Sequence, residues 1–398
     1  MTIKSIRQIR IKNLSGRKVF LRVDFNIPIE NGKIKDDYKI IACLPTIRFL
    51  LRHRCKVIIA THLGRPLSRN TQRATHNIKN FSIKPIAARL SKLLGKKVKF
   101  VDDCVGFKVG TEASKLKEGQ ILMLENLRFN KGEKNNSKKF AKELASLADI
   151  YINNAFAASH RNHASVSAIK KYLTSYAGIL LEQELIHLNK ILKPNKPLIL
   201  VIGGVKIATK IKLIKKLYKR TSRILIGGAL ANIFFAAHKL EVGKSIVDKQ
   251  SIKFAKNFKY KNIILPIDVI VSDKKDGTGK AIVKNVYTVK KNEIILDIGP
   301  QTVRLYNSFI KQAKTIIWNG PMGMFEQERF KYGTLSIARS VAARSTGHAF
   351  GLVGGGETAE ALKMTKMFDY VDWVSTSGGA MLAYLAGDRM PGLTGLIK

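Results

Sequence analysis

The sequence predicts an α/β protein of two domains, each with a parallel sheet covered by helices on both faces. Short, β-branched apolar runs recur along the chain, and longer stretches with helical periodicity separate most of them. Continuous apolar strands that alternate with helices are typical of parallel sheets buried on both faces. The length of 398 residues exceeds that of one ordinary domain and fits two.

The predicted strands each end close to Gly, Asn, Asp or His, which interrupt regular structure. They span residues 19–23, 57–60, 121–124, 150–152, 198–202, 224–226, 263–265, 315–318 and 350–353. Helical spacing is found in residues 85–94, 137–147 and 207–217. A further helix, 179–192, runs into the proline-containing segment 193–197, which is a natural breaker and marks the join between the domains.

The composition is strongly basic, with 71 Lys and Arg against 28 Asp and Glu and a net charge of +43. Such a surplus favours anionic partners, among them nucleic acids, anionic lipids and acidic small molecules. The basic residues are nevertheless spread along the chain, and the longest purely basic runs are pairs. Neither a zinc-finger spacing nor an RNA-binding aromatic signature is present. We therefore interpret the charge as a lysine bias of solvated surfaces and do not expect nucleic acid as the main partner.

The cysteines and the N-terminus point to a cytoplasmic protein. Cys43, Cys55 and Cys104 form no C-x-x-C pair, so neither a disulfide framework nor a zinc knuckle is expected. Residues 1–18 interleave Lys and Arg without an apolar core, unlike a signal peptide. Because no apolar run reaches about 18 residues, we expect neither a transmembrane helix nor a membrane partner.

The strand ends of the first half are rich in Arg and His, and ligands of open α/β sheets bind at such ends. Arg presents a planar fork suited to phosphate and carboxylate oxygens. Any one of these residues is compatible with an ordinary surface cation or turn, but the set together predicts an anion cradle. It consists of His62, Arg65, Arg128 and Arg161. Asp24 and Asn26 could hydrogen-bond substrate hydroxyls or could cap a turn. His160 and His163 form a His-x-x-His pair without a nearby carboxylate or Cys, which favours a structural or anion-binding role over a metal site.

The strand ends of the second half are rich in Gly, and such loops let the backbone approach phosphates. Lys206 and Lys210 would share one helix face and could neutralise a phosphoryl group in transfer, although solvated lysines would show the same spacing. Glu357 follows three glycines, where a carboxylate could hold nucleotide-bound magnesium. A relaxed dinucleotide fingerprint begins at Gly354, but it lacks the acid expected about 20 residues further on, so an oxidoreductase is the weakest alternative.

Taken together, these loops resemble the phosphoglycerate kinase family, in the same order over about residues 17–396. The segments that carry the resemblance are 22–26, 61–66, 124–129, 160–161, 203–206, 297–300, 318–326, 354–356 and 375–376. The resemblance implies two Rossmann-like three-layer domains joined by a helix and hinge. Residues 1–177 would bind phosphoglycerate, 178–197 would form the interdomain helix and hinge, 198–374 would bind nucleotide, and 375–398 would return to the N-terminal domain.

The resemblance also implies reversible phosphoryl transfer between 1,3-bisphosphoglycerate with ADP and 3-phosphoglycerate with ATP, in glycolysis and gluconeogenesis, by a cytoplasmic monomer that uses Mg²⁺. The implied substrate-binding residues are Asp24, Phe25, Asn26, Lys39, His62, Leu63, Gly64, Arg65, Arg128 and Arg161. The implied nucleotide-binding residues are Lys210, Gly227, Gly228, Asn319, Glu326, Gly355, Gly356, Glu357 and Thr358, with Glu357 at the nucleotide-bound Mg²⁺. The implied catalytic residues are Lys39, Lys206 and Lys210.

The chain departs from the family pattern at several of these positions. Lys39 stands where the family has a catalytic Arg, and it keeps the charge but lacks the fork. Glu357 stands where the family has Asp, and its extra methylene reaches further toward the metal. Further departures are Asn154 in place of Asp, and Ala157, Ala229 and Ser377 in place of Gly. These changes keep open the alternative of a weakly active or inactive scaffold that binds polyanions through its charge of +43.

Overall fold

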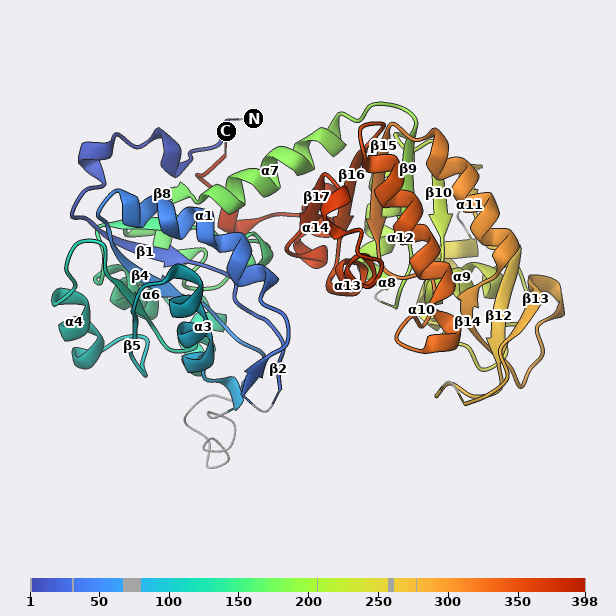
Figure 1. Ribbon diagram of the computed structural model, residues 1–398, viewed down its shortest axis with the longest axis horizontal. Coiled ribbons are helices and arrows are strands. Elements are labelled where there is room, and N and C mark those ends of the chain that lie inside the picture. The colour runs from blue at the N-terminus through green and yellow to red at the C-terminus, as the bar shows by residue number, and fades with distance from the viewer. Residues whose placement is uncertain are drawn as a thin grey trace. The chain divides into compact units, whose positions relative to one another are not determined.

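The computed structural model describes residues 2–30, 32–66, 80–205, 207–256, 261–276 and 278–397. Its backbone contacts divide the chain into two compact units (Figure 1). Unit 1 comprises Met1–Ile186 together with Arg389–Lys398, and unit 2 comprises His187–Asp388. The boundaries and functions that the sequence suggests for the domains remain predictions. None of the helices in the described ranges combines the length and hydrophobicity that a membrane crossing requires.

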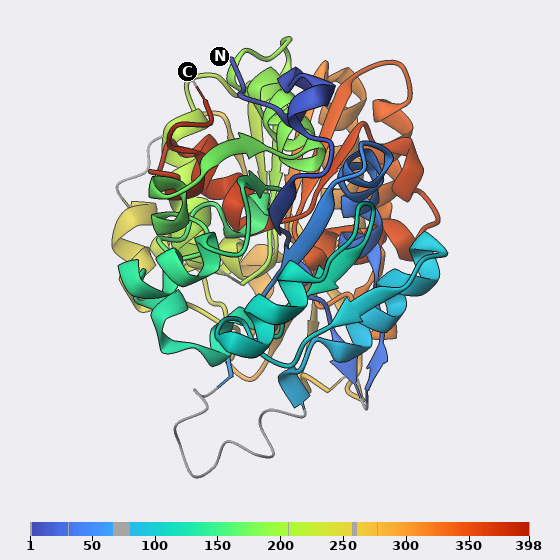
Figure 2. The ribbon, with the colours of Figure 1, turned by 90° about the vertical axis from the view of Figure 1, so that its left-hand side faces the viewer.

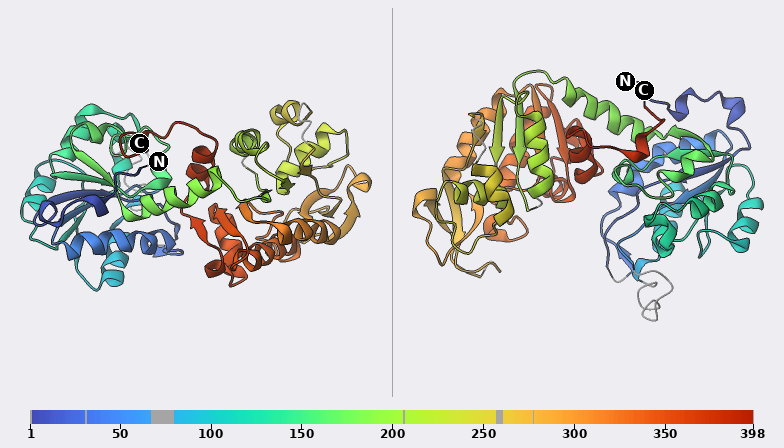
Figure 3. Two further views of the ribbon diagram at one scale, coloured as in Figure 1. Left: turned by 90° about the horizontal axis from the view of Figure 1, so that it is seen from above. Right: turned by 180° about the vertical axis from the view of Figure 1, so that it is seen from behind.

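Within the described residues, unit 1 contains a sheet of six parallel strands in the order β5-β6-β4-β1-β7-β8. The strands are β1 (Lys18–Arg22), β4 (Lys56–Ala60), β5 (Val98–Phe100), β6 (Ile121–Met123), β7 (Ile150–Asn153) and β8 (Thr174–Ala177). The accompanying helices are α1 (Tyr38–Arg52), α3 (Lys84–Leu94), α4 (Phe107–Ser114), α5 (Lys131–Lys134) and α6 (Lys138–Ala145). Helices cover both faces of this sheet (Figures 2 and 3). A short hairpin, β2 (Ile29–Glu30) with β3 (Lys33–Ile34), precedes α1.

The central strand β1 shows why these segments read as continuous apolar runs. It pairs with β4 on one side and β7 on the other, and its residues after Lys18 are all buried. Phe20 stacks with Tyr151 of β7 at a ring-centroid distance of 6.2 Å. Since helices lie on both faces, successive side chains point into protein on either side, and an alternating polar pattern would place polar groups in the core.

Helix α6 shows the complementary pattern of a helix that covers a sheet. Ser137 caps it by accepting the N–H of Phe140 at 3.4 Å. Phe140, Ala141 and Leu144 are buried on one face, and they join a core cluster with residues of β1, β4 and β6. The apolar stripe at helical spacing therefore determines which face packs on the sheet.

Within the described residues, unit 2 contains a second sheet of six parallel strands, in the order β11-β10-β9-β15-β16-β17. The strands are β9 (Leu198–Ile202), β10 (Arg223–Ile226), β11 (Ile263–Ile264), β15 (Thr315–Asn319), β16 (Phe350–Gly354) and β17 (Trp373–Ser375). The helices are α8 (Ile207–Leu217), α9 (Gly228–Ala237), α10 (Lys249–Lys256), α11 (Pro300–Gln312), α12 (Tyr332–Ser345), α13 (Gly356–Met364) and α14 (Gly378–Leu385). Helix α7 (Ile179–Leu192) contains the boundary between the two units.

The α/β prediction is confirmed, with sheets of parallel strands in both units. Every predicted strand occurs, with each end within one residue of the prediction, and the predicted helices occur with small shifts at their ends. The short edge strands β5, β8 and β17 were not predicted, because they contain too few apolar residues to stand out. Unit 2 also contains an antiparallel sheet that was not predicted, formed by β13 (Ile282–Asn285), β12 (Asp268–Ser272) and β14 (Ile294–Ile298).

Short 3₁₀ helices shape several of the connections. They are η1 (Ile6–Gln8), η2 (Ile11–Asn13), η3 (Leu127–Phe129), η4 (Phe156–Ala158), η5 (Ala168–Lys171), η6 (Val286–Thr288), η7 (Glu328–Phe330), η8 (Phe368–Tyr370) and η9 (Pro391–Leu393).

The C-terminal segment from Arg389 packs within unit 1 through backbone hydrogen bonds. The N–H of Gly392 in η9 donates to the carbonyl of Ser159 at 2.8 Å, and its carbonyl accepts from Asn153 Nδ2 at 3.0 Å. Lys170 donates to the carbonyls of Pro391 and Thr394 at 2.6 and 2.8 Å. The close approach at Gly392 leaves no space for a side chain, because a Cβ there would lie 2.7 Å from Ser159 Cα.

We expect Gly392→Ala to lower the free energy of unfolding of unit 1 by about 1–3 kcal/mol, since the C-terminal segment must move to relieve the overlap. Urea denaturation followed by circular dichroism would measure this. Gly110→Ala is the matched control, because Gly110 lies inside α4 and a Cβ there would have no other atom within 4 Å. The control should be neutral or stabilising by about 0.5–1 kcal/mol. Equal stability of Gly392→Ala and the unaltered protein would contradict the packing described.

Candidate active site

The structure brings the predicted polar residues of unit 1 to one edge of its sheet. The strands β6, β4, β1 and β7 are neighbours. Asp24 follows β1 and His62 follows β4, while Arg128 lies in η3 after β6 and Arg161 comes after η4, which follows β7. Because parallel strands present their carboxyl ends at the same edge, these four side chains start from adjacent positions.

Asp24 and Lys39 form an ion pair at this edge. Lys39 Nζ lies 3.2 Å from Asp24 Oδ2, and the N–H of Asn26 donates to Asp24 Oδ1 at 2.9 Å. Burial alone would raise the pKa of Asp24, but the charge of Lys39 with the other groups around it outweighs burial and holds that pKa below its usual range. Asp24 is therefore ionised, and it fixes the position of the Lys39 ammonium.

The loop after β4 is held by amide side chains. The N–H of Gly64 donates to Asn26 Oδ1 at 2.8 Å, and the N–H of Leu63 donates to Asn126 Oδ1 at 3.2 Å. Asn126 Nδ2 donates back to the carbonyl of Leu63 at 2.8 Å, and Arg128 Nη1 donates to the carbonyl of Gly64. Gly64 has a φ of +59°, a left-handed conformation that favours glycine. The loop that carries the predicted residues 62–65 thus has a defined conformation.

Arg65, Arg128 and Arg161 add positive charge to this part of unit 1. Arg128 is buried, and its Nε has no hydrogen-bond partner among the described residues. Burial lowers the pKa of Arg161, as do Arg22 and Arg65, whereas Asp24 acts in the opposite direction. A buried guanidinium with an unused N–H favours an anionic ligand, whose oxygens would complete its hydrogen bonds.

A buried charge pair, which was not predicted from the sequence, lies next to these residues. Arg22, the last residue of β1, and Glu133 of α5 are both fully buried, with Nη2 and Oε1 3.9 Å apart. Ser165 bridges them, since its Oγ accepts from Arg22 Nε at 2.8 Å and donates to Glu133 Oε1 at 2.7 Å. Arg22 Nη2 also lies 3.0 Å from Nδ1 of His62. An arginine inside an otherwise apolar predicted strand was the signal that could have identified this pair.

In unit 2 the predicted glycine loops lie where the strand order reverses. From β9 the chain proceeds through β10 to β11 on one side, and later through β15 and β16 to β17 on the other. Ligands of open α/β sheets bind at such a switch point. Gly203 and Gly204 follow β9, Gly320 follows β15, and Gly227 with Gly228 follows β10.

These loops approach one another too closely for side chains. Gly228 has a φ of +57°, and a Cβ there would lie 2.6 Å from the backbone nitrogen of Gly204. A Cβ at Gly203 would lie 2.1 Å from the carbonyl oxygen of Pro321. Side chains at these positions would collide with backbone, so the switch point is lined by main chain. Exposed main-chain N–H groups are the groups that glycine-rich phosphate sites use.

Lys210 lies among these loops. It is buried on α8, and its Nζ donates to the carbonyl of Gly203. A Cβ at Gly204 would lie 2.8 Å from Nζ, and one at Gly320 would lie 3.0 Å from it. The ammonium group is therefore located between the ends of β9 and β15. Lys206 lies outside the described residues, so its expected place beside Lys210 stays a prediction.

The loop after β16 is tied to the loop after β15 by two predicted nucleotide residues. Asn319 Nδ2 donates to the carbonyl of Gly354 at 2.5 Å. Thr358 Oγ1 accepts the N–H of Gly320 at 2.8 Å and lies 3.1 Å from the carbonyl of Gly354. Gly355, with a φ of +106°, turns the chain into α13. Asn319 and Thr358 thus fix the position of a helix N-terminus, where backbone N–H groups attract anions.

Two predicted carboxylates of unit 2 are open to solvent. Glu357 lies in the first turn of α13, and Glu326 follows the loop after β15. Both side chains are exposed, and neither forms an ion pair with another residue of the described ranges. No group of three or more His, Cys, Asp or Glu side chains within the same ranges could hold a metal by itself.

The departures from the family pattern cause no backbone strain. Ala157 lies in η4 and Ala229 in α9, and neither has a positive φ. Ser377 has a φ of −152°, and its side chain caps α14 by accepting the N–H of Ala380 at 3.2 Å. Asn154 Oδ1 accepts from Thr46 Oγ1 at 2.9 Å, so the carboxamide takes part in the core hydrogen bonding of unit 1. The alanines and serine therefore fit their positions.

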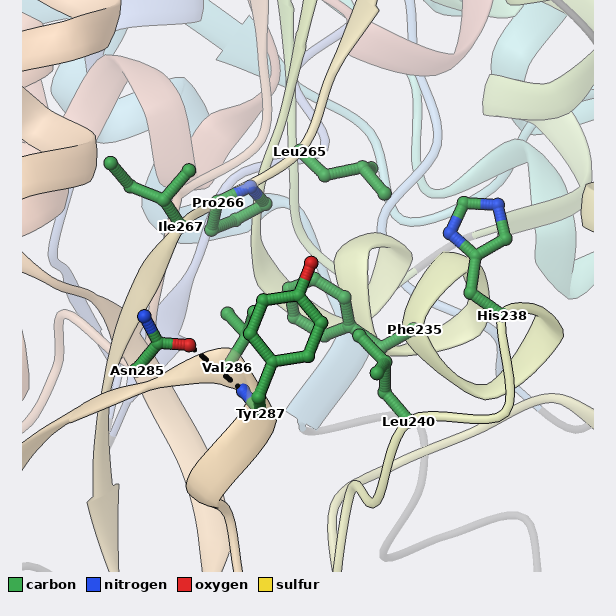
Figure 4. Close-up of a pocket in the computed structure, with 9 residues that line it drawn as sticks. All are labelled: Phe235, His238, Leu240, Leu265, Pro266, Ile267, Asn285, Val286 and Tyr287. Atoms are coloured by element: carbon green, nitrogen blue, oxygen red, sulfur yellow. Dashed lines mark hydrogen bonds between the residues drawn. The ribbon is translucent and has the colours of Figure 1, made fainter.

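A cavity of about 320 Å³ lies elsewhere in unit 2 (Figure 4). Its lining is mostly apolar and includes Phe235, Leu265 and Val286. Asn285 Oδ1 is engaged by the backbone N–H of Tyr287 at 3.1 Å, as the dashed line in Figure 4 shows. None of the residues predicted from the sequence to bind ligand lines this cavity.

The carboxyl group of Asp297, in β14, packs against the loop after β15. Its Oδ2 accepts the N–H of Gly333 at 2.8 Å, and its Oδ1 accepts the N–H of Ile298 at 2.9 Å. A Cβ at Gly323 would lie 2.3 Å from Oδ1, so the loop packs directly against the carboxyl group. Burial raises the pKa of Asp297 to about 8, because these two hydrogen bonds only partly compensate the lost hydration.

Comparison with known proteins gives a consistent result over the whole chain. A family model described as phosphoglycerate kinase matches residues 8–388. The phosphoglycerate kinase of Trichodesmium erythraeum is 39% identical over 404 residues, covering 100% of this chain and 99% of that protein. The phosphoglycerate kinase of a Wolbachia from Drosophila simulans is 42% identical over 407 residues, with the same coverage of 100% and 99%.

Solved structures agree with the sequence relatives. The structure of phosphoglycerate kinase from Coxiella burnetii matches with a TM-score of 0.84 and 37% identity, covering 100% of both chains. The crystal structure of phosphoglycerate kinase from Pyrococcus horikoshii matches with a TM-score of 0.85 and 30% identity, covering 98% of each chain.

The raised pKa of Asp297 predicts that the protein becomes less stable as the pH rises. With a pKa of about 8 in the folded protein against an ordinary 3.8, the folded state binds the additional proton between these values. The free energy of unfolding contributed by Asp297 should therefore fall as pH rises through this window, by up to about 1.4 kcal/mol per pH unit. Asp297→Asn removes the ionisation. Chemical denaturation at about pH 5 and about pH 8 should show that the free energy of unfolding of the variant, relative to that of the unaltered protein, is larger at the higher pH. A difference between the two proteins that does not change with pH would contradict the burial argument.

Proposed function

The chain belongs to the phosphoglycerate kinase family, and we propose that unit 1 binds the phosphoglycerate and unit 2 the nucleotide. The observation that carries this assignment is the contrast between the two sheet edges. Guanidinium, imidazole and ammonium groups gather at the edge of unit 1, as a small dianionic or trianionic metabolite requires. Glycine loops meet at the switch point of unit 2, as the phosphates of a nucleotide require.

Membership in the family makes the chain a phosphotransferase of glycolysis. It transfers a phosphoryl group reversibly between 1,3-bisphosphoglycerate with ADP and 3-phosphoglycerate with ATP. The family assignment argues against an oxidoreductase. The alternative of a weakly active or inactive scaffold that binds polyanions shares this fold, and the coupled assay described below tests it.

For the phosphoglycerate, the proposed ligands divide by chemistry. Arg65, Arg128 and Arg161 would bind the phosphate and carboxylate oxygens, for which their planar forks are suited. Asp24, which is ionised, would accept from the substrate hydroxyl, with Asn26 beside it. The remaining members of the proposed set are Phe25, Lys39, His62, Leu63 and Gly64, and the backbone of 62–64 is held by Asn26 and Asn126.

For the nucleotide, the proposed ligands are the main chain of the glycine loops and a few polar groups. The loops after β9, β10 and β15 meet at the switch point, and α13 presents its N-terminus beside them. The proposed set is Lys210, Gly227, Gly228, Asn319, Glu326, Gly355, Gly356, Glu357 and Thr358. Asn319 and Thr358 act chiefly by holding the loop after β16 in place, since both already hydrogen-bond to it or to the loop beside it.

Magnesium fits this site as an ion that arrives with the nucleotide. The described residues contain no cluster of protein ligands for a metal, whereas Glu357 offers one exposed carboxylate in the first turn of α13. Mg²⁺ keeps several waters and is commonly held by one or two carboxylates together with substrate phosphates. Bound in this way it would neutralise charge on the phosphates, and Glu357 would hold it.

The transfer itself needs no covalent enzyme intermediate. In-line transfer requires the acceptor oxygen, the phosphoryl group and the leaving oxygen to be aligned, with positive charge around the equatorial oxygens. We propose that this charge comes from Lys39, which pairs with Asp24, and from Lys210, which donates to the carbonyl of Gly203. Lys206, which lies outside the described residues, is the third proposed source of charge. These three lysines are the proposed catalytic residues.

We further propose that the chain works as a cytoplasmic monomer. Cys43, Cys55 and Cys104 are all buried and unbridged, which suits a reducing compartment. The monomer rests on the family resemblance alone.

The position of Lys39 tests the catalytic assignment. In a coupled assay with Mg-ATP and 3-phosphoglycerate, Lys39→Met should lower kcat by about 10²–10³-fold, the usual cost of losing one donor to developing charge. Lys39→Arg restores a planar fork and should raise kcat by roughly threefold to tenfold.

Lys35→Met is the matched control for Lys39→Met. Lys35 is exposed, pairs with Glu30 at 3.1 Å and belongs to no proposed site, so kcat should be unchanged. If Lys39→Met retains full kcat, Lys39 is not catalytic and the assignment is wrong.

The position of Glu357 tests the magnesium assignment. Glu357→Gln should raise the Mg²⁺ concentration needed for half-maximal rate by about tenfold, because one anionic oxygen ligand is lost. Glu360→Gln provides the comparison, since Glu360 is exposed on the same helix three residues further along. An equal Mg²⁺ requirement in both variants would show that Glu357 does not hold the ion.

A further inference from the structure

The side chain of Arg22 is engaged on every nitrogen and faces protein only. It is fully buried at the end of β1. Nε donates to Ser165 Oγ at 2.8 Å, Nη1 donates to the carbonyl of Val23, and Nη2 lies 3.0 Å from Nδ1 of His62. A guanidinium held at three nitrogens has a fixed orientation, so the His62 ring has a fixed partner behind it.

This contact determines which nitrogen of His62 carries the proton. Arginine remains protonated and has donors but no acceptor. Nδ1 of His62 must therefore accept the hydrogen bond from Arg22 Nη2, and the proton of the neutral ring must be on Nε2. Within the described ranges, Nε2 of His62 makes no hydrogen bond of its own, so this N–H is available to a ligand oxygen.

Glu133 and Ser165 keep Arg22 in this orientation. Glu133 is fully buried, and its Oε1 lies 3.9 Å from Arg22 Nη2. Ser165 donates to Glu133 through both its Oγ and its backbone N–H, at 2.7 and 3.0 Å. The buried carboxylate balances the buried guanidinium, and without it the charge of Arg22 would be uncompensated in the core.

The groups around His62 keep its ring neutral. His62 is only 2% exposed. Burial lowers the pKa of His62 to about 3, with Arg22, Arg161 and Lys39 acting in the same direction and Asp24 against them. The imidazole therefore carries no charge at any pH near neutrality, although it stands beside the proposed anion cradle.

We propose that Arg22, held by Glu133 and Ser165, is a positioning residue that fixes His62 as the neutral Nε2–H tautomer, so that His62 binds the phosphoglycerate as an uncharged donor. The binding step of this inference rests on the proposed phosphoglycerate site, whereas the tautomer does not. Lys39 and the arginines attract the anion by their charge, whereas His62 orients it through a hydrogen bond.

Nitrogen NMR of ¹⁵N-histidine-labelled protein tests the tautomer without substrate. Nδ1 of His62 should appear as an unprotonated acceptor and Nε2 as a protonated nitrogen, unchanged between about pH 5 and about pH 8. The His62→Gln variant identifies the resonances by their disappearance. A ring that titrates in this interval, or that carries its proton on Nδ1, would overturn the proposal whether or not the enzyme turns over.

A double variant tests the role of Arg22 in binding. In Arg22→Met with Glu133→Gln, both buried charges are removed together and Nδ1 of His62 loses its donor, while the burial that keeps the ring neutral remains. The neutral ring can then carry its proton on Nδ1, and the ¹⁵N spectrum should show Nδ1 at least partly protonated. The KM for 3-phosphoglycerate should rise about tenfold, because the ring then presents an acceptor in place of the Nε2–H donor.

A matched control separates positioning from stability. Lys284→Met with Glu293→Gln removes a largely buried pair in unit 2, whose Nζ and Oε1 lie 2.6 Å apart. This control should lose stability while the His62 tautomer and the KM stay unchanged. An unchanged tautomer and KM in the Arg22 and Glu133 variant as well would show that the pair is only structural. Should that variant fail to fold, the NMR measurement on the unaltered protein still decides the proposal.

Discussion

Helices cover both faces of both sheets, and this coverage constrains where chemistry can occur in the molecule. A strand buried on both faces has no solvated side, so the central residues of β1, β4, β9 and β15 are apolar. The polar side chains of these strands therefore lie at the strand ends or in the loops that follow them. Since the strands are parallel, those loops gather at one edge, and a few residues from distant parts of the chain become neighbours.

The loops at the carboxyl ends of the strands differ in chemistry between the two units. In unit 1 the loops carry side chains that bring charge, and the sheet must stabilise that charge from behind. The pair of Arg22 and Glu133 shows the cost, because two fully buried ions need each other and Ser165 to remain in the core. In unit 2 the loops carry almost no side chains, and the contacts among Gly203, Gly204 and Gly228 bring main chain to the place where phosphates would bind.

The departures from the family pattern fall into two groups once the structure is considered. Ala157, Ala229 and Ser377 occupy backbone conformations that any residue adopts, so replacing glycine there costs no strain. Lys39 and Glu357 differ in kind, since both are side chains proposed to meet the reacting phosphates. Lys39 is oriented by Asp24 and supplies a charge without a fork. Any catalytic difference between this chain and its relatives would therefore arise at these two side chains rather than in the scaffold.

The sequence by itself determined the fold class, most strands of the two six-stranded sheets and the loops of the proposed site, because apolar periodicity and glycine position are local properties of the chain. It also indicated Asp24, His62, Arg128, Lys210 and Thr358, since each lies in the connection after a strand or in the first turn of a helix. Only the tertiary structure decided which of these side chains meet, as between Lys39 and Asp24 or Lys210 and Gly203. It alone revealed the antiparallel sheet of β12–β14 and the buried Arg22, Glu133 and Ser165, which lie up to 143 residues apart in sequence. Contacts between distant residues depend on how the elements pack, and packing leaves no periodic trace in the sequence of any one element.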